Sequence, residues 1–311
     1  MDGLNIDSKE YLRAAGLHQF NIHDQESYLP ATLVYSLLAQ VSKREQIENL
    51  GSFFSEYLKF NRLSDWGQMI LSTPNLLTSL EIGVRFNHVL CTHQRAEFHI
   101  KDTTSSYLWS YDDNQAYGKE QVDYTNLLYA IDGIRIGVGS NWSPLEIHTI
   151  CADLPDLDRF LPHGAKTIIR TNQEKSGIVF ETSLLSTSMP GKPQVNYEYS
   201  DQELSIRNKI YCLLDAWCGG SLPVIDVIAE MGSMSRVTLY RKLHHEGTSY
   251  MDIVDNWRFV KALKLLNVQD RPSSIKEVSQ MLKYSNPSNF ERSFKRWTGT
   301  TPARFRDSIL R

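Results

Sequence analysis

Apolar residues follow the same order twice in the C-terminal third of the chain, over 222–249 and again over 272–301. In each stretch they recur at the three- and four-residue intervals that place side chains on one face of a helix, which predicts a helix, a short turn and a second helix. The matched apolar positions of the two second helices are Leu239 with Phe290 and Leu243 with Phe294. Such self-similarity indicates a duplicated structural unit.

Polar residues mark where these helices begin. Ser274 and Glu277 have the spacing of a capping box, in which the hydroxyl and the carboxylate bond the free backbone amides at a helix start. Asn286 before Pro287 predicts the start of the next helix, since Asn accepts from those amides and Pro has no N–H to lose there. Ser235 predicts the corresponding start in the first copy.

The segment between the two copies, 249–268, contains no Gly or Pro and carries apolar residues on several faces. Such a helix is expected to be buried between two subdomains. A helix of about 20 residues is about 30 Å long, and successive major-groove faces on one side of B-DNA recur at about 34 Å. Its length would suit two helix-turn-helix units held one turn of DNA apart.

The N-terminal part predicts a mixture of helices and strands. Helix-spaced apolar residues occur within 29–60 and 123–138, whereas short apolar or alternating runs predict strands at 95–100, 107–111, 167–170 and 178–182. Ser186–Pro193 contains two prolines and a glycine, which interrupt regular structure. We therefore expect an α+β N-terminal domain over 1–190, a linker over 191–203, and an all-α domain over 204–311 with two helix-turn-helix subdomains joined by a linker helix.

The outward faces of the two second helices carry side chains that can read base edges. An α-helix fits the major groove, where Arg can bond guanine, Asn can bond adenine, and Val or Tyr can pack on a thymine methyl group. The candidates for base contact are Arg236, Val237, Tyr240, Arg241, Ser288, Asn289 and Arg292. The candidates for phosphate contact, which adds affinity without sequence preference, are Lys242, Lys295, Arg296 and Arg306. A lone charged residue is usually only solvated, but its place in a duplicated unit favours a DNA contact.

This arrangement resembles the DNA-binding domain of the AraC/XylS family of transcription regulators. The residues that carry the likeness include Ile228-Ala229-Glu230-Met231, Thr238-Leu239-Tyr240-Arg241-Lys242-Leu243, Arg258, Ala262-Leu263-Lys264-Leu265-Leu266, Phe290-x-Arg292-x-Phe294-Lys295-Arg296-Trp297, and Pro302-x-x-Phe305-Arg306. Members of the family usually have Gly in each turn, where this chain has Ser233 and Lys283. Those two residues would therefore have to adopt a positive φ, which Ser and Lys can do at a small cost.

The first 200 residues more loosely resemble the α+β regulatory domain found in one branch of that family. The likeness rests on Ala14-Ala15-Gly16-Leu17, Asn141-Trp142-Ser143-Pro144, Ile178-Val179-Phe180 and Met189-Pro190. It implies a domain for effector sensing or self-association. Together the two resemblances imply a sequence-specific transcription regulator, more often an activator in this family, with double-stranded DNA, RNA polymerase, a small-molecule effector and a second copy of the chain as expected partners.

Charge is divided unevenly along the chain. Residues 203–311 hold 17 Lys and Arg against 11 Asp and Glu, a net charge of +6, whereas residues 1–202 hold 16 against 25, a net charge of −9. A basic C-terminal third beside an acidic remainder suggests that only the last part meets a polyanion. No apolar run is long enough to span a bilayer and the N-terminus lacks the features of a signal peptide, so a cytoplasmic location without a membrane partner is expected.

Competing classes of function find little support in the sequence. The four cysteines include no Cys-x-x-Cys pair, so neither a disulfide framework nor the zinc site of a DNA-repair methyl acceptor is expected. His88, Cys91, His93 and His99 match no standard zinc spacing, and neither a phosphate-binding Gly loop nor a nucleophile elbow occurs. A purely architectural DNA protein would not explain the large acidic domain. We therefore expect no enzyme activity, catalytic residue, metal or cofactor.

Overall fold

The computed structural model describes residues 7–24, 27–48, 50–57, 60, 65–87, 91, 93–112, 118–190, 205–266 and 274–309. It divides into two compact units, an α+β unit followed by an all-α unit, which confirms the expected fold class. The first unit combines Met1–Leu17 with Ala31–Leu204, and the second combines His18–Pro30 with Ser205–Arg311. The predicted domain limits remain predictions, and the predicted linker over 191–203 lies outside the described residues.

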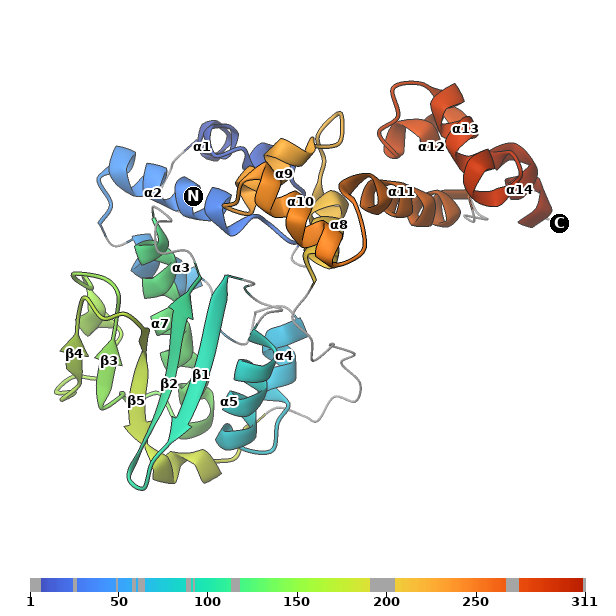
Figure 1. Cartoon of the computed structure of the whole chain (residues 1–311). Coiled ribbons are helices and arrows are strands. Elements are labelled where there is room, and N and C mark those ends of the chain that lie inside the picture. The colour runs from blue at the N-terminus through green and yellow to red at the C-terminus, as the bar shows by residue number, and fades with distance from the viewer. Residues whose placement is uncertain are drawn as a thin grey trace. The chain divides into compact units, whose positions relative to one another are not determined.

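A five-stranded sheet forms one layer of the first unit, with strand order β1-β2-β5-β3-β4 (Figure 1). All neighbouring strands are antiparallel except β3 and β4, which are parallel. The strands are β1 Gln94–Ile100, β2 Thr104–Tyr111, β3 Glu146–His148, β4 Ile168–Arg170 and β5 Ser176–Glu181. The four strands expected from the sequence are therefore confirmed to within a few residues at their ends.

Helix α7, Lys119–Val138, packs against β5 and supplies much of the core of this unit. Its Leu127 and Ile131 are almost fully buried, as are Ile178 and Phe180 on β5. Among the described residues of this unit, the other helices are α1 Ser8–Ala14, α2 Ala31–Glu45, α3 Leu50–Tyr57, α4 Asp65–Leu71 and α5 Leu76–Arg85. Short 3-10 turns occur at Leu157–Arg159 and Thr182–Ser186 in this unit.

A buried carboxylate joins α7 to two strands of the sheet, β2 and β5, and to the residue that follows β3. Asp123 is fully buried, and its Oδ1 accepts hydrogen bonds from the Trp109 indole at 2.8 Å and the Tyr111 hydroxyl at 2.9 Å. Its Oδ2 accepts from the hydroxyls of Ser176 at 2.6 Å and Thr149 at 3.1 Å. Burial raises the pKa of Asp123, and these four donors oppose that rise because they favour the charged form.

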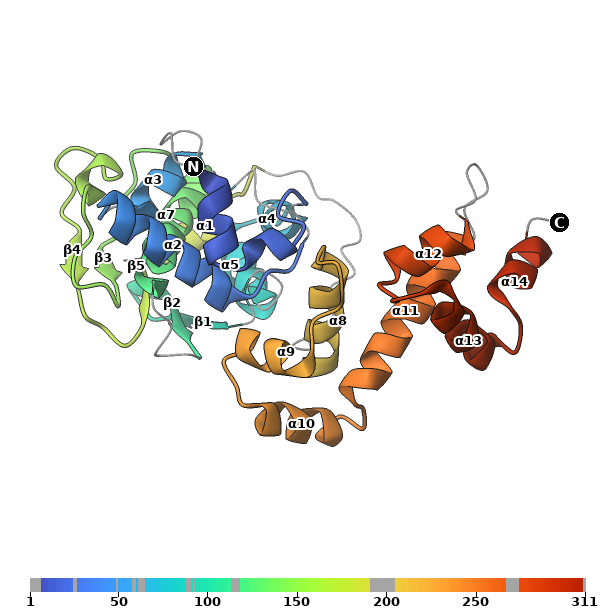
Figure 2. The same ribbon diagram turned by 90° about the horizontal axis from the view of Figure 1, so that it is seen from above.

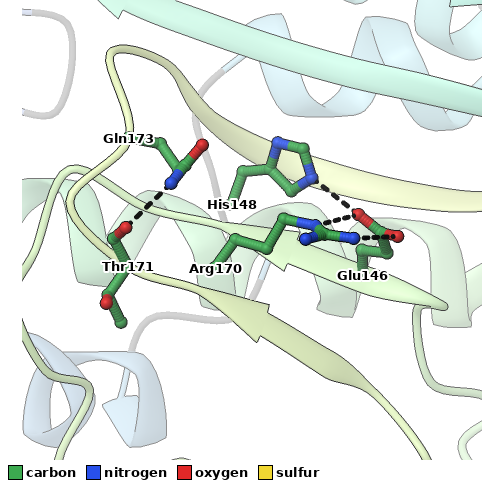
Figure 3. Close-up of polar contacts among 5 residues, drawn as sticks. All are labelled: Glu146, His148, Arg170, Thr171 and Gln173. Atoms are coloured by element: carbon green, nitrogen blue, oxygen red, sulfur yellow. Dashed lines mark hydrogen bonds and ion pairs between the residues drawn. The ribbon is translucent and has the colours of Figure 1, made fainter.

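The edge of the sheet is held by ion pairs between β3 and β4, as Figure 3 shows. Arg170 binds both carboxylate oxygens of Glu146, at 2.6 and 2.9 Å, and the His148 ring lies 2.9 Å from the same carboxylate. The hydrogen bonds from Arg170 and then His148 lower the pKa of Glu146 to about 2. Beyond β4, the Gln173 amide donates to the Thr171 carbonyl at 2.9 Å. Within this cluster the charge of Glu146 is balanced by that of Arg170, so the cluster serves to hold the two short strands together.

The second unit consists of seven helices in the part of the chain that the structure describes, and Figure 2 gives a second view of them. They are α8 Ile206–Ala216, α9 Ile225–Met231, α10 Arg236–His245, α11 Tyr250–Leu266, α12 Ile275–Met281, α13 Pro287–Thr298 and α14 Pro302–Ile309. The predicted caps at Ser235, Ser274 and Asn286 are confirmed, including the capping box completed by Glu277. The predicted linker helix is α11, and the last two residues expected in it lie outside the described residues.

A segment from near the N-terminus belongs to this second unit. Phe20 forms a β-bridge with Trp217, and their rings meet edge to face with centroids 5.2 Å apart. The Asn21 amide donates to the Ala216 carbonyl at 2.8 Å. This pairing could not be predicted from the sequence, because a single bridge has no periodic pattern. Among the described residues, no helix is both long and apolar enough to cross a lipid bilayer.

We expect Asp123→Ala to lower the free energy of unfolding by about 3 kcal/mol or more, because each buried donor left without a partner costs roughly 1–3 kcal/mol. Asp123→Asn should cost less, since the hydroxyls of Ser176 and Thr149 can turn to accept from the new amide. Urea unfolding followed by tryptophan fluorescence measures both values. Equal stability of the Ala variant and the parent chain would contradict the role given to this carboxylate.

Candidate nucleic-acid interface

Both copies of the duplicated unit turn between their helices in the same way. Ser233 and Lys283 have φ values of 50° and 60°, so both residues adopt the left-handed conformation that favours glycine. In each turn a backbone amide reaches five residues back: Met234 donates to the Ala229 carbonyl at 3.0 Å and Tyr284 to that of Ser279 at 3.1 Å. This is the hydrogen bond of a Schellman motif. Two turns with one backbone geometry therefore set the angle at which α10 leaves α9 and α13 leaves α12.

Helix α10 is fixed by its apolar face and leaves the predicted base-contacting side chains exposed. Leu239 and Leu243 are each 1% exposed, as expected from the spacing. Val237 is 77% exposed and Tyr240 is 44% exposed, although both are large and apolar. Arg241 and Lys242 are also exposed. Uncovered apolar side chains next to cations fit contact with the methyl groups and acceptors of a DNA groove.

Arg236 begins this helix and is held by its neighbours. Its guanidinium donates to the Tyr240 hydroxyl at 3.1 Å and lies over the Tyr240 ring at 5.3 Å. It also pairs with the Asp226 carboxylate on α9 at 3.2 Å. The hydrogen bond to Tyr240 and then the charge of Asp226 raise the pKa of Arg236. Two predicted contact residues, Arg236 and Tyr240, are thus brought together on one helix face.

Helix α13, like α10, has a buried apolar face and an exposed polar face, and two aromatic rings form its buried face. Phe290 and Phe294 are fully buried, whereas Ser288, Arg292 and Lys295 are exposed. The Arg292 guanidinium donates to the Asn289 side-chain oxygen at 2.5 Å. The Asn289 amide in turn donates to the Ser285 hydroxyl at 3.0 Å, so Asn289 is only half-exposed. Two of the three residues of this helix that were predicted to contact bases, Asn289 and Arg292, therefore form one ordered pair.

A cationic groove is formed by α11, the turn between α12 and α13, and α13. It is lined by Arg258, Lys283, Tyr284, Ser285, Asn289, Arg292, Ser293 and Arg296, which include four cations and no acidic side chain. Arg296 pairs at 2.5 Å with Asp255, which stands on α11 and is not among the lining residues. With Arg296 paired to Asp255, the other three cations of the lining, Arg258, Lys283 and Arg292, still make a binding surface for phosphate or an electron-rich base edge.

Arg258 was not predicted to have a role in this groove. Its guanidinium donates to the carbonyls of Leu282 at 3.1 Å and Lys283 at 3.2 Å, and it lies 4.1 Å from the centre of the Tyr284 ring. It thereby connects α11 to the turn between α12 and α13, which contains the left-handed residue Lys283. The sequence showed Arg258 only as a match to the family pattern, because its role depends on packing between helices that are distant in sequence.

The remaining candidates are dispersed. Lys295 and Ser288 are exposed on α13 but do not line the groove. Arg306, on α14, is half-buried, with Asp307 at 3.7 Å. The described residues contain no group of three or more His, Cys, Asp or Glu side chains placed to hold a metal ion. Of the histidine and cysteine set weighed from the sequence, His88 lies outside the described residues.

Two protein families match this chain. Residues 6–189, more than half of the chain, match the N-terminal arabinose-binding domain of AraC transcription regulators, and residues 228–308 match a helix-turn-helix domain. Both matches agree with the division into an α+β unit and a helical unit.

Individual relatives match over shorter segments. The HTH-type transcriptional regulator VqsM of Pseudomonas aeruginosa is 33% identical over 104 residues, which cover 33% of this chain and 31% of that protein. The ornithine utilization regulator of the same organism is 32% identical over 89 residues, covering 29% and 26%. The aligned segments thus span less than a third of either relative. Among solved structures, the transcriptional regulator CdpR from Pseudomonas aeruginosa aligns over 96% of both chains with 17% identity and a TM-score of 0.39.

We expect Ser233→Gly and Lys283→Gly each to raise the free energy of unfolding by up to about 1 kcal/mol. A left-handed conformation costs an L-residue roughly 1–2 kcal/mol, and the greater freedom of glycine in the unfolded chain offsets about 0.5–1 kcal/mol of the gain. Lys264→Gly is the matched control, because Lys264 is exposed within α11 and glycine there should cost about 1 kcal/mol. Thermal unfolding in which all three variants lose stability would contradict the strain assigned to the turns.

Proposed function

Because the chain belongs to the AraC family of transcription regulators and is a DNA-binding protein of that type, we propose that α10 and α13 enter two consecutive major-groove segments of one DNA site. The observation that carries the proposal is the repeated geometry, in which both helices follow a left-handed turn and expose Arg at matching positions. Arg241 and Arg292 hold the same place in the two copies. One protein would then read two half-sites without a second copy.

Helix α11, which joins the two helix-turn-helix units, has a length that fits this arrangement. The 17 residues of α11 make a helix about 25 Å long, and successive major-groove faces recur at about 34 Å. Because α11 is shorter than this spacing, the rest of the separation would have to come from the positions of α10 and α13 within their own helix-turn-helix units. The buried residues Ile253, Val254, Trp257, Ala262 and Leu266 keep the helix from bending freely.

We assign base contact to Arg236, Val237, Tyr240, Arg241, Ser288, Asn289 and Arg292. The pair of Arg292 and Asn289 supports this most strongly, because a guanidinium already held by a neighbouring amide loses less rotamer freedom when it binds a base. Lys242, Lys295, Arg296 and Arg306 are assigned to phosphate. To these we add Arg258 and Lys283, which line the same groove as Arg292.

Arg292→Ala should weaken binding to the preferred site by about 1–3 kcal/mol and relax discrimination at one base position. Lys295→Ala is its matched partner on the same helix; it should weaken binding to all sequences alike and reduce the slope of log affinity against log salt by about 1. Selection of sites from random DNA, followed by titrations at several salt concentrations, measures both effects. An Arg292→Ala protein that selects the parental sequence with undiminished preference would refute the assignment.

We further propose that the N-terminal unit modulates DNA binding, that the protein acts as an activator through contact with RNA polymerase, and that a small-molecule effector or a second copy adjusts it. The domain matched over 6–189 supports an effector, because that family is described as arabinose-binding. The chain itself also supplies a link: it leaves the first unit after Leu17, contributes His18–Pro30 to the second, and returns at Ala31. A conformational change in α1 or α2 would therefore reach the second unit through the chain segment that connects them.

Light scattering over a range of concentrations, with and without operator DNA, tests self-association. We expect a concentration-dependent rise in mass toward that of a dimer, steeper when DNA with two copies of the site is present, because neighbouring sites raise the effective concentration. A constant monomer mass under every condition would remove the second copy from the proposal and leave the effector as the source of modulation.

A further inference from the structure

Two arginines on the helices assigned to DNA contact are paired with carboxylates from neighbouring helices. Arg236, on α10, lies 3.2 Å from the carboxylate of Asp226 on α9. Arg296, on α13, lies 2.5 Å from the carboxylate of Asp255 on α11. Both pairs are accessible to solvent, since the two arginine side chains are 53% and 63% exposed. Each helix-turn-helix unit therefore presents one arginine whose charge is already balanced.

The arginines at matching positions of the two copies differ in this respect. Among the residues that the structure describes, Arg241 and Arg292 have no carboxylate within ion-pair distance. Arg292 donates instead to the neutral side-chain oxygen of Asn289, and Arg258 donates to backbone carbonyls. The surface thus carries arginines of two kinds, one with its full charge and one with its charge cancelled by a held carboxylate.

The ion pairs leave donors of these arginines free. A guanidinium carries five N–H donors in a fixed fork. Arg236 directs one terminal nitrogen to Asp226 and the other to the Tyr240 hydroxyl, and Arg296 directs one terminal nitrogen to Asp255. Within the described part of the chain, the Nε atoms of both arginines form no hydrogen bond. Each arginine can therefore donate to an atom of DNA while it remains on its carboxylate.

A bound carboxylate changes how such an arginine acts at DNA. Binding to any sequence is driven by positive charge near the phosphates and is weakened by salt, so an arginine with a cancelled charge adds little to it. A hydrogen bond from a free N–H acts at short range and in one direction, so it forms only where the helix is fully seated in the groove. The paired arginine therefore favours one register over sequence-independent attachment, as a repulsive element does in other specific interfaces.

We propose that Asp226 and Asp255 are specificity-determining residues that act by positioning: each holds one arginine and cancels its charge, so that the arginine strengthens binding to the preferred site but not attachment to unrelated DNA. The inference rests on the function proposed above, because it requires α10 and α13 to meet DNA. Exposed ion pairs contribute little to stability. The two carboxylates are therefore not needed for folding, and their variants can be compared with the parent chain.

The test measures binding of the full-length protein to a duplex of unrelated sequence and to the selected site, by fluorescence anisotropy at several salt concentrations. Asp255→Asn keeps an acceptor for Arg296 but removes the charge. A carboxylate roughly 6 Å from a phosphate repels it by an amount that corresponds to about threefold in affinity in water. We therefore expect about threefold tighter binding to unrelated DNA, with the slope of log affinity against log salt steeper by about 1.

The affinity for the selected site should change less, because a looser hold on the arginine offsets the gain in charge, and the ratio of the two affinities should fall. Asp226→Asn should have the same effects through Arg236. The double variant should steepen the salt slope by about 2, since the two pairs stand on different helices and act on different phosphates. Thermal unfolding should give the parental midpoint for all three variants.

Two further variants serve as controls. Asp255→Glu keeps the charge and can still reach Arg296, so it should restore the parental slope and ratio. Glu291→Gln removes the same charge from α13, where Glu291 is exposed and has no ion-pair partner in the ranges that the structure describes. It lies about 140° around the helix from Arg296 and should leave both quantities near their parental values.

A parental salt slope in both Asp226→Asn and Asp255→Asn would overturn the proposal, and so would an equal change of slope and ratio in Glu291→Gln. Binding to unrelated DNA requires no operator, so these outcomes do not depend on whether the protein selects a sequence. Failure to select any sequence from random DNA would overturn the function proposed above. A steeper slope in the same variants would then still assign to the two carboxylates the limit on attachment to phosphates.

Discussion

The DNA-binding unit depends on the burial of one helix, α11, whose residues belong to the packing of both helix-turn-helix units. Tyr250, its first residue, donates to the Pro223 carbonyl, and Trp257, near its middle, donates to Asp215 of α8 at 2.9 Å. Toward its end, Ala262 and Leu266 join the core formed by Phe290 and Phe294. A displacement of α11 in one helix-turn-helix unit would therefore disturb the packing of the other helix-turn-helix unit.

The all-α unit and the α+β unit hold their central helices, α11 and α7, in place by different kinds of contact. In the helical unit, the contacts around α11 are mainly apolar, and Arg258 adds a charged clamp on a helix end. In the α+β unit, α7 is apolar along most of its buried face, but Asp123 places a carboxylate among four donors, three on β2 and β5 and one just after β3. Hydrogen bonds have stricter geometry than apolar contacts. The polar network therefore fixes the register of α7 on the sheet, whereas apolar packing alone would allow small shifts.

Much of the helical unit could be predicted from the sequence because its signals are local. Caps such as Ser274 with Glu277, and the spacing of Phe290 and Phe294, act within one or two turns of helix. The positive φ of Ser233 and Lys283 followed from the resemblance to a family with Gly at those places. By contrast, β3 is three residues long, too short for an alternating pattern.

What the sequence could not provide are contacts between distant segments. The clamp of Arg258 on Leu282 and the hydrogen bond from Trp257 to Asp215 arise only when separate elements pack together. An Arg or a Trp on a helix has no local feature that reveals such a partner. The predicted reading residues of α10 and α13 were accessible to sequence analysis because they lie opposite a buried stripe on the same helix, and their roles at DNA remain predictions.

The bridge between Phe20 and Trp217 makes the helical unit discontinuous along the chain. A fragment that began at Ser205 would lack Phe20, and with it the ring that covers one side of the Trp217 indole. Recombination that joined this C-terminal part to a foreign N-terminal domain would carry the same defect. The helix-turn-helix pair of this protein is therefore less transferable as a module than its position at the end of the sequence suggests.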